Sequence, residues 1–185
     1  MRELILGGAR SGKSRLAEKR ATVYEALGLE VVYIATAEAW DEEMAERLSH
    51  HRHRRPAHWV TVEEPVRLAR VLQTHAAHDR CLIVDCITLW LSALVFKGLA
   101  VGQMESGQPI DCELFARERQ ALLDVLSGLP GEIILVSNEI GSGVVPENRL
   151  ARRFADEQGR LNQDLAARCE RVTLSVAGIP LSLRG

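Results

Sequence analysis

Eight residues near the N-terminus match a motif that binds phosphate. They follow the pattern G-x-x-x-x-G-K-[ST] and are Gly7, Gly8, Ala9, Arg10, Ser11, Gly12, Lys13 and Ser14, below called the Walker loop. Glycines let such a loop turn tightly, so that backbone N–H groups and the N-terminal end of the following helix converge on phosphate oxygens. We expect Lys13 to bridge the β- and γ-phosphates and the Ser14 hydroxyl to ligate Mg²⁺. The motif therefore predicts nucleoside-triphosphate binding and phosphoryl transfer with Mg²⁺ as cofactor.

Asp85 fits the acidic partner that such a loop requires. It directly follows the apolar run Cys81-Leu82-Ile83-Val84, which is typical of a buried strand. We expect the carboxylate to contact Mg²⁺ together with Ser14, either directly or through water. The alternative is that Asp85 caps the helix that begins at Ile87, and both roles are compatible.

Residues 47–58 hold a second concentration of reactive side chains. Four of the six histidines are interleaved with four arginines: His50, His51, His53 and His58 with Arg47, Arg52, Arg54 and Arg55. A zinc site is disfavoured, because the arginines would repel a dication. Two hypotheses stay open on the residues alone, a solvated basic face and an anion site. In the anion site an imidazole would take a phosphoryl or nucleotidyl group as a phosphoramidate.

Several segments together resemble one enzyme family. They are GGARSGKS at 7–14, YIATA at 33–37, RLSHHRHRRPAHW at 47–59, TVEEP at 61–65, VDC at 84–86 and SNEIGSGVVPENRLARRFADEQGRLNQDLA at 137–166. These stretches are similar to the bifunctional adenosylcobinamide kinase / adenosylcobinamide-phosphate guanylyltransferase of cobalamin biosynthesis. The Walker loop alone is generic, whereas the histidine–arginine segment and the NEIGSGVVPENRLAR stretch are specific.

The resemblance implies two reactions on a RecA-like P-loop domain that forms a homo-oligomer, a trimer or a related assembly. First, the γ-phosphate of ATP or GTP passes to the hydroxyl of the aminopropanol arm of adenosylcobinamide. GTP then guanylylates an enzyme histidine and releases pyrophosphate. The phosphorylated substrate finally takes up the GMP, which gives adenosylcobinamide-GDP.

The resemblance also implies roles for particular residues. His51 stands in the family's H-R-x-x-R-P pattern and is expected to be the nucleophile, with the adjacent His50 as its rival. The remaining expected nucleotide contacts are Arg52, His53, Arg54 and Arg55, Glu63 of TVEEP, and Ala35, Thr36 and Ala37. Two other functions stay open: a P-loop kinase of another small molecule, and a RecA-like regulatory nucleotide-binding protein.

Composition narrows the classes of partner. Among 185 residues, 23 are Lys or Arg and 25 are Asp or Glu, so the net charge is -2, and eight are aromatic. Balanced charge and scarce aromatics argue against nucleic acid as a partner. The four cysteines form no CxxC pair, and the longest apolar stretch, 82–96, is shorter than the roughly 18 residues that a membrane helix needs. We therefore expect a cytoplasmic protein without membrane insertion.

Alternating apolar runs and helical patterns must position these residues. Strands are expected at 3–6, 31–35, 59–62, 81–85, 133–137, 172–176 and 180–183, and helices at 13–27, 40–52, 64–75, 87–96, 111–126 and 146–169. This alternation predicts one α/β domain over residues 1–185, with a mainly parallel sheet and helices on both faces. Ligands of such sheets bind at the carboxyl ends of the strands, where Gly7, Ala35 and Asp85 are expected to meet.

Overall fold

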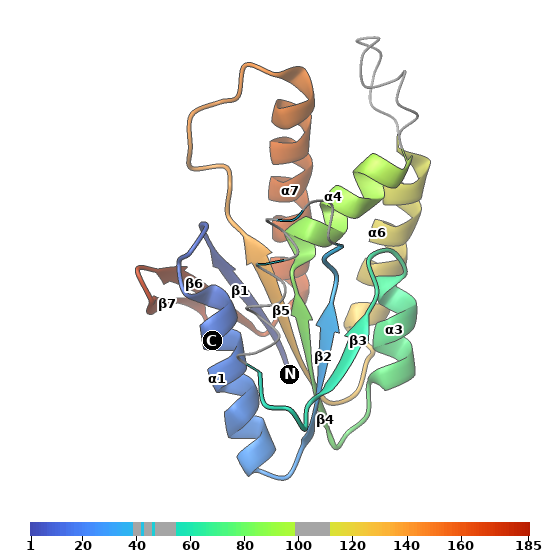
Figure 1. The fold of residues 1–185 in the computed structure, drawn as a ribbon, viewed down its shortest axis with the longest axis vertical. Helices are drawn as coiled ribbons and strands as arrows, with labels where there is room; N and C mark the ends of the chain where they lie inside the picture. The colour runs from blue at the N-terminus through green and yellow to red at the C-terminus, as the bar shows by residue number, and fades with distance from the viewer. Residues whose placement is uncertain (39–41, 43–45, 47–54, 99–111) are drawn as a thin grey trace.

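The seven strands form one mixed sheet (Figure 1). The computed structural model describes residues 1–38, 42, 46, 55–98 and 112–185, so the helix expected at 40–52 lies largely outside the described residues. The strands are β1 Arg2–Gly7, β2 Glu30–Ala35, β3 Val60–Glu63, β4 Arg80–Asp85, β5 Glu132–Asn138, β6 Arg171–Val176 and β7 Ile179–Arg184. Their order is β3-β2-β4-β5-β1-β6-β7, and all neighbours are parallel except the pair β6–β7.

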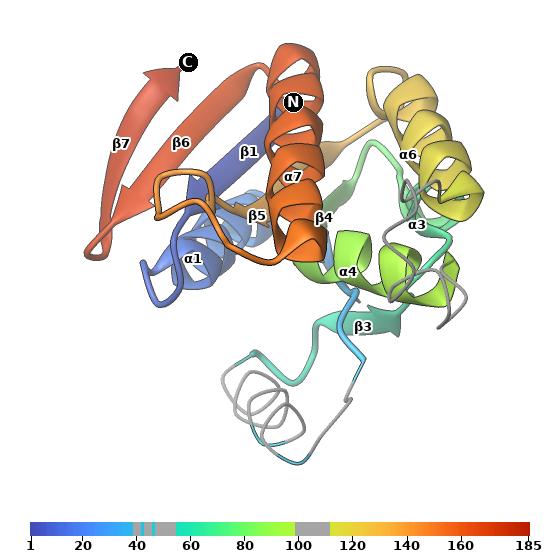
Figure 2. The same ribbon diagram turned by 90° about the horizontal axis from the view of Figure 1, so that it is seen from above.

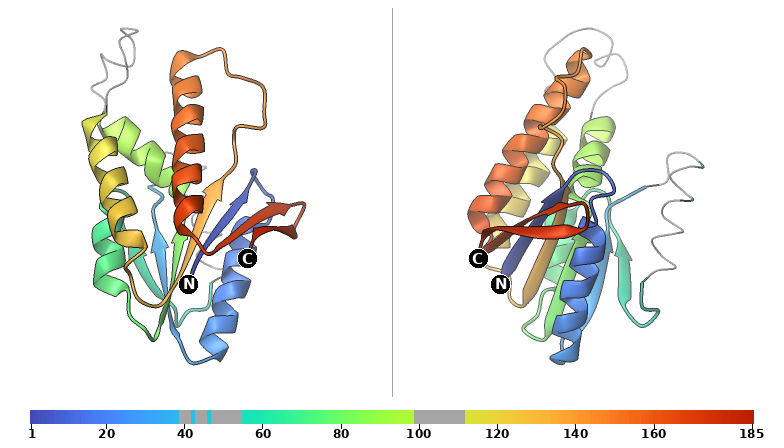
Figure 3. Two further views of the ribbon diagram at one scale, coloured as in Figure 1. Left: turned by 180° about the vertical axis from the view of Figure 1, so that it is seen from behind. Right: turned by 90° about the vertical axis from the view of Figure 1, so that its left-hand side faces the viewer.

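Helices cover both faces of the sheet, but unequally. The helices are α1 Lys13–Ala26, α3 Leu68–His75, α4 Ile87–Gly98, α6 Glu113–Leu126 and α7 Arg149–Arg168. Within the described part of the chain, α1 alone packs on one face, and the other four pack on the opposite face (Figures 2 and 3). The prediction of a mainly parallel sheet with helices on both faces is confirmed.

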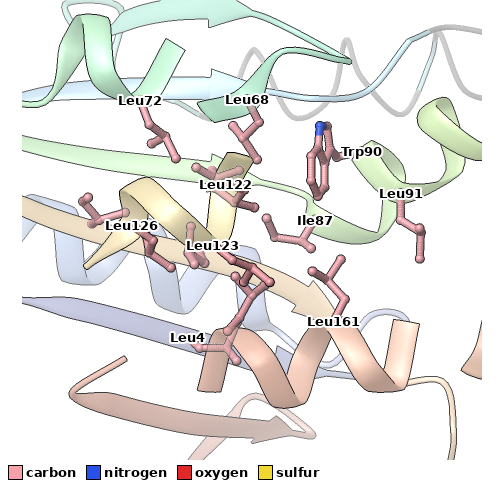
Figure 4. Packing of buried hydrophobic residues seen from close by; sticks show 14 of the residues in the cluster. Leu4, Leu68, Leu72, Ile87, Trp90, Leu91, Leu122, Leu123, Leu126 and Leu161 are labelled. Carbon is pink, nitrogen blue, oxygen red and sulfur yellow. The ribbon is translucent and has the colours of Figure 1, made fainter. Parts of the chain in front are cut away.

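Each central strand alternates its side chains between two apolar cores. In β1, Leu4 joins the core under the four helices and Ile5 joins the core under α1. The larger core holds leucines from the sheet and from the helices, including Leu122 and Leu161, together with Trp90 (Figure 4). A parallel strand buried on both faces needs apolar residues at nearly every position, which is why short unbroken apolar runs marked these strands in the sequence.

The last two strands, expected at 172–176 and 180–183, form a hairpin around Gly178. Val176 pairs with Ile179, so the connection has two residues, Ala177 and Gly178, with φ angles of 52° and 79°. Two successive positive φ angles are the requirement of a type I′ turn. In this hairpin, β7 lies at the edge of the sheet with all its residues exposed.

Two helices begin later than the sequence predicts. Helix α3 starts at Leu68 instead of residue 64, because the Glu64 carboxylate accepts the backbone N–H groups of Val66 and Arg67 at 2.9 and 2.8 Å and forms a turn there. Helix α7 starts at Arg149 instead of residue 146 and is capped by Asn148, whose side chain accepts the Ala151 N–H at 3.0 Å. Within the described ranges, no helix has both the length and the apolar character that a membrane crossing demands.

Candidate nucleotide-binding site

The carboxyl ends of five parallel strands bring the predicted site residues to one edge of the sheet. Ala35 lies in register between Glu63 on β3 and Asp85 on β4. On the other side of β5, Gly7 of β1 is in register with Asn138. Strand β5 therefore separates the Walker strand β1 from the Asp85 strand β4, and its last residues lie between the two halves of the site.

The Walker loop has the backbone geometry of a phosphate cradle. Arg10 and Gly12 adopt left-handed φ angles of 55° and 93°, and the Ser11 N–H donates to the Gly8 carbonyl at 3.3 Å. Left-handed residues alternating with right-handed ones turn successive N–H groups toward a common point, which favours an anion. Lys13 donates from Nζ to the Gly8 carbonyl at 3.0 Å, so its ammonium group lies over the loop.

The hairpin β6–β7 contacts this loop through hydrogen bonds and close packing. The Ser11 carbonyl accepts two hydrogen bonds at 2.8 Å, one from the Gly178 N–H and one from the Ser175 hydroxyl. A Cβ at Gly12 would lie 3.0 Å from the Gly178 Cα, and a Cβ at Gly7 would lie 2.6 Å from the Ser175 carbonyl oxygen. Both glycines are therefore required by close packing against the hairpin.

Asp85 and Ser14, the two residues expected to bind Mg²⁺, meet at the mouth of the Walker loop. The Ser14 hydroxyl donates to Oδ1 of Asp85 at 3.2 Å, and the Tyr33 hydroxyl donates to Oδ2. Both oxygens of the carboxylate thus face hydroxyl groups. Among the described contacts, neither oxygen accepts a backbone N–H of the helix that begins at Ile87, the bond by which Asp85 would cap that helix.

The donor set suits Mg²⁺ better than a transition metal. A hydroxyl and one carboxylate are hard oxygen ligands, and Mg²⁺ in nucleotide sites is held by one or two such groups together with phosphate oxygens and water. No cluster of three or more His, Cys, Asp or Glu side chains with metal-binding geometry occurs in the described residues. Ser14 and Asp85 would therefore hold the ion only in company with a bound triphosphate.

Tyr33 connects Asp85 to the histidine–arginine segment. Its side chain is 1% exposed, and the Arg55 guanidinium carbon lies 3.4 Å from the centre of its ring, which is a cation–π contact. Burial and the neighbouring Asp85 carboxylate raise the pKa of the Tyr33 phenol well above 10, although Arg55 opposes this shift. The phenol is therefore protonated at neutral pH and donates to Asp85.

Arg55 also lies at the edge of an open pocket beside β3. The pocket has a volume of about 400 Å³ and is lined by Arg55, Pro56, Ala57, Trp59, Thr61 and Glu63. The Trp59 indole N–H donates to Glu25 at 2.9 Å, and the His58 ring contacts the same carboxylate at 2.6 Å. These contacts lower the pKa of Glu25, and the hydrogen bond with His58 has the largest effect. They also attach the segment to helix α1.

Thr36, which the resemblance places among the nucleotide contacts, lies in the interior of the protein. Its side chain is fully buried, and its hydroxyl donates to the Cys86 carbonyl at 2.6 Å and accepts the Cys86 N–H at 2.8 Å. Thr36 thereby fixes the backbone directly after Asp85. Ala35 is buried in the core beneath α1, and Ala37 is partly exposed beyond the end of β2.

Some predicted residues cannot be placed, and some structural ones were not predicted. His50, His51, Arg52, His53 and Arg54 lie outside the described residues. The sequence did not single out Tyr33 or the two hairpin residues that hold the Walker loop. A tyrosine in an apolar strand is ordinary, so only its contact with Asp85 distinguishes it.

The fold and the site define the class of protein. A mainly parallel sheet with a Walker loop after β1 and an acidic residue at the end of β4 is the arrangement of a RecA-like P-loop nucleotide-binding enzyme. An ATPase of the type III secretion system of pathogenic bacteria superposes with a TM-score of 0.52 at 15% identity, over 98% of this chain and 56% of the ATPase. The ATPase EscN of enteropathogenic E. coli superposes with a TM-score of 0.53 at 15% identity, over 95% of this chain and 43% of EscN. The chain thus spans about half the length of these ATPases, and the likeness concerns the fold alone.

Within this class, the chain belongs to the CobU family, described as cobinamide kinase / cobinamide phosphate guanyltransferase, whose model matches residues 3–183. It is 55% identical to the bifunctional adenosylcobalamin biosynthesis protein CobP of Pseudomonas aeruginosa, over 100% of this chain and 98% of the relative. It is 42% identical to the protein CobU of Salmonella typhimurium and 38% identical to that of Escherichia coli, over 98% of each chain. The protein is a cobinamide kinase and cobinamide-phosphate guanylyltransferase of adenosylcobalamin biosynthesis, as the resemblance in its sequence predicted.

Proposed function

We propose that the Walker loop, Ser14 and Asp85 form the triphosphate site of the kinase reaction. The observation that carries this proposal is the 3.2 Å contact between the Ser14 hydroxyl and Asp85 at the mouth of the loop. The loop N–H groups and Lys13 would hold ATP or GTP, with Lys13 moving from the Gly8 carbonyl to the β- and γ-phosphates. Mg²⁺ bound by Ser14 and Asp85 would neutralise charge on these phosphates.

In the kinase step, the hydroxyl oxygen of the aminopropanol arm of adenosylcobinamide attacks the γ-phosphorus. The bond between this phosphorus and the β,γ-bridging oxygen breaks, and the nucleoside diphosphate leaves while the hydroxyl proton passes to solvent or phosphate. Lys13 and the loop N–H groups stabilise the charge that develops on the bridging oxygen.

In the guanylyl step, His51 is the nucleophile. Its imidazole attacks the α-phosphorus of GTP, pyrophosphate leaves, and a guanylyl phosphoramidate forms on the protein. A phosphate oxygen of adenosylcobinamide phosphate then attacks the same phosphorus, which frees His51 and gives adenosylcobinamide-GDP. Arg55 supports this assignment, because it lies four residues from His51 and lines the pocket that also contains Glu63. In this proposal Arg52, His53, Arg54, Arg55 and Glu63 contact the nucleotide.

We also propose that the protein acts as a homo-oligomer of single-domain chains. Strand β7 supports the assembly, because it is an edge strand whose apolar residues Ile179, Leu181 and Leu183 are 69%, 56% and 56% exposed. Sedimentation at several concentrations measures the assembly directly.

Labelling with GTP that carries a radioactive α-phosphate tests the guanylyl step. With Mg²⁺ present, the protein should retain label on a denaturing gel, and the label should survive base and be lost in acid, as a phosphoramidate is. His51→Ala should abolish the label, and His50→Ala is the matched control that should keep it. Label lost in His50→Ala but retained in His51→Ala would move the nucleophile to the neighbouring residue.

Two further variants test the triphosphate site. Lys13→Ala and Asp85→Asn should each lower the kinase rate at least a hundredfold, because Lys13 neutralises charge on the transferring phosphate and Asp85 would hold the Mg²⁺ that does the same. Kinase activity close to that of the wild type in either variant would contradict the assignment.

A further inference from the structure

The Asp85 carboxylate is oriented by its neighbours and not by its backbone alone. Thr36 fixes the peptide groups of the next residue, Cys86, and so fixes where the Asp85 side chain starts. The rotation of the carboxylate about its own bonds is then set by the two hydroxyls that face its oxygens. Of these, Ser14 is expected to turn toward Mg²⁺ when nucleotide binds, which leaves Tyr33 as the constant partner.

The same tyrosine holds Arg55. The guanidinium group stacks on the Tyr33 ring at 3.4 Å, and its Nε is buried without a hydrogen-bond partner among the described residues. A buried donor without an acceptor is costly, so the stacking contact is the described interaction that keeps the guanidinium in place. Arg55 is thus held beside the nucleotide pocket by a side chain that simultaneously holds the acidic residue of the Walker site.

We propose that Tyr33 is a positioning residue shared by the two reactions. Its hydroxyl orients Asp85 for Mg²⁺, and its ring orients Arg55 at the nucleotide pocket. This inference rests on the proposed function, because it takes Asp85 as a magnesium ligand and Arg55 as a nucleotide contact. Tyr33 itself touches neither substrate, so the two halves of its role are separable by substitution.

Tyr33→Phe tests the hydroxyl and keeps the ring. The chain contains one other tyrosine, Tyr24 on α1, whose phenol faces Glu132 on the far part of the sheet, so Tyr24→Phe is the matched control. The readout is binding of Mn²⁺ to the protein with a nonhydrolysable GTP analogue, measured by electron paramagnetic resonance. Loss of a group that orients a metal ligand weakens the metal site about 10- to 100-fold, and we expect this for Tyr33→Phe and not for Tyr24→Phe. Wild-type Mn²⁺ affinity in Tyr33→Phe would overturn this half of the proposal.

Tyr33→Leu and Arg55→Met test the ring. Both remove the stacking contact, so both should raise the KM for GTP in protein labelling about tenfold, whereas Tyr33→Phe at saturating Mg²⁺ should leave that KM near the wild-type value. Arg55→Met keeps the buried tyrosine and therefore tests whether Arg55 contributes to GTP binding, the premise of this half, even if Tyr33→Leu does not fold. Equal KM values in Arg55→Met and the wild type would overturn this half. An unlabelled wild-type protein would contradict the proposed guanylyl step, and the Mn²⁺ comparison would still decide the role of the hydroxyl.

Discussion

Replacement of Gly12 by alanine tests whether the geometry of the Walker loop depends on the C-terminal hairpin. Gly12 has a φ of 93°, and a Cβ there would lie 3.0 Å from the Gly178 Cα. A left-handed conformation costs an L-residue about 1–2 kcal/mol, and the close contact with the hairpin backbone adds to this cost. We therefore expect Gly12→Ala to lower the free energy of unfolding by about 2 kcal/mol.

Urea unfolding measures this change, and the chain offers a control of opposite sign. With a urea dependence of about 3 kcal/mol/M, a loss of about 2 kcal/mol lowers the midpoint by about 0.7 M. Gly159 lies inside helix α7, and a Cβ there meets no atom within 4 Å. Gly159→Ala should therefore raise the free energy of unfolding by about 0.5–1 kcal/mol, since alanine favours helix over glycine.

The same two variants should differ in nucleotide binding. The strain at Gly12 is relieved by moving the loop N–H groups away from the phosphates, so we expect GTP affinity to fall at least tenfold, whereas Gly159→Ala should bind GTP like the wild type. Equilibrium dialysis with GTP measures both. An unchanged urea midpoint and unchanged GTP affinity in Gly12→Ala would refute the role assigned to the contact with Gly178.

Three further changes test other parts of the structure. Leu161→Ala removes a fully buried side chain of α7 and should lower the free energy of unfolding by about 2–5 kcal/mol, measured in urea. The contact with His58 lowers the pKa of Glu25, so it stabilises the fold at pH values above the ordinary pKa of 4.5. This stabilisation is lost as the pH falls through the lowered pKa. The unfolding free energies of Glu25→Gln and the wild type should therefore converge in acid. Burial raises the pKa values of Cys81 and Cys169 from 9.0 to about 12, so thiolate should be about a thousandfold scarcer and alkylation at pH 8 should be slow until urea unfolds the chain. Rapid alkylation of the native protein at these two thiols would contradict their buried positions.

The strands and the Walker loop were predictable because their signals are local. A parallel strand buried on both faces reads as a short apolar run, so β4 was expected at 81–85 and is observed at Arg80–Asp85. Asp85 was chosen as the partner of the Walker loop because it ends a buried strand and ligands bind at the carboxyl ends of parallel strands, and in the structure it contacts Ser14. Neither inference required knowledge of which strands are neighbours.

The supporting residues were not predictable, because their roles depend on contacts between distant parts of the chain. Tyr33 is recognised only once β2 lies beside β4 and Arg55 stacks on its ring. The predicted start of α3 was wrong for a different reason. Proline and glutamate are common in the first turn of a helix, so the sequence predicted a start at residue 64. In the structure the Glu64 carboxylate instead closes a separate turn before the helix. Local propensity could not distinguish these two arrangements.

The hydrogen bonds from Ser175 and Gly178 to the Ser11 carbonyl also constrain the order in which the protein becomes competent during synthesis. The phosphate-binding motif precedes Ser175 and Gly178 by more than 160 residues, so the Ser11 carbonyl gains these hydrogen bonds only after those residues have been translated and β6 has paired with β1. While these residues are being made, the nascent chain therefore carries the motif without the hydrogen bonds that support its loop. Since a ligand stabilises only the state that binds it, ATP and GTP favour the finished chain and give no support to its precursors.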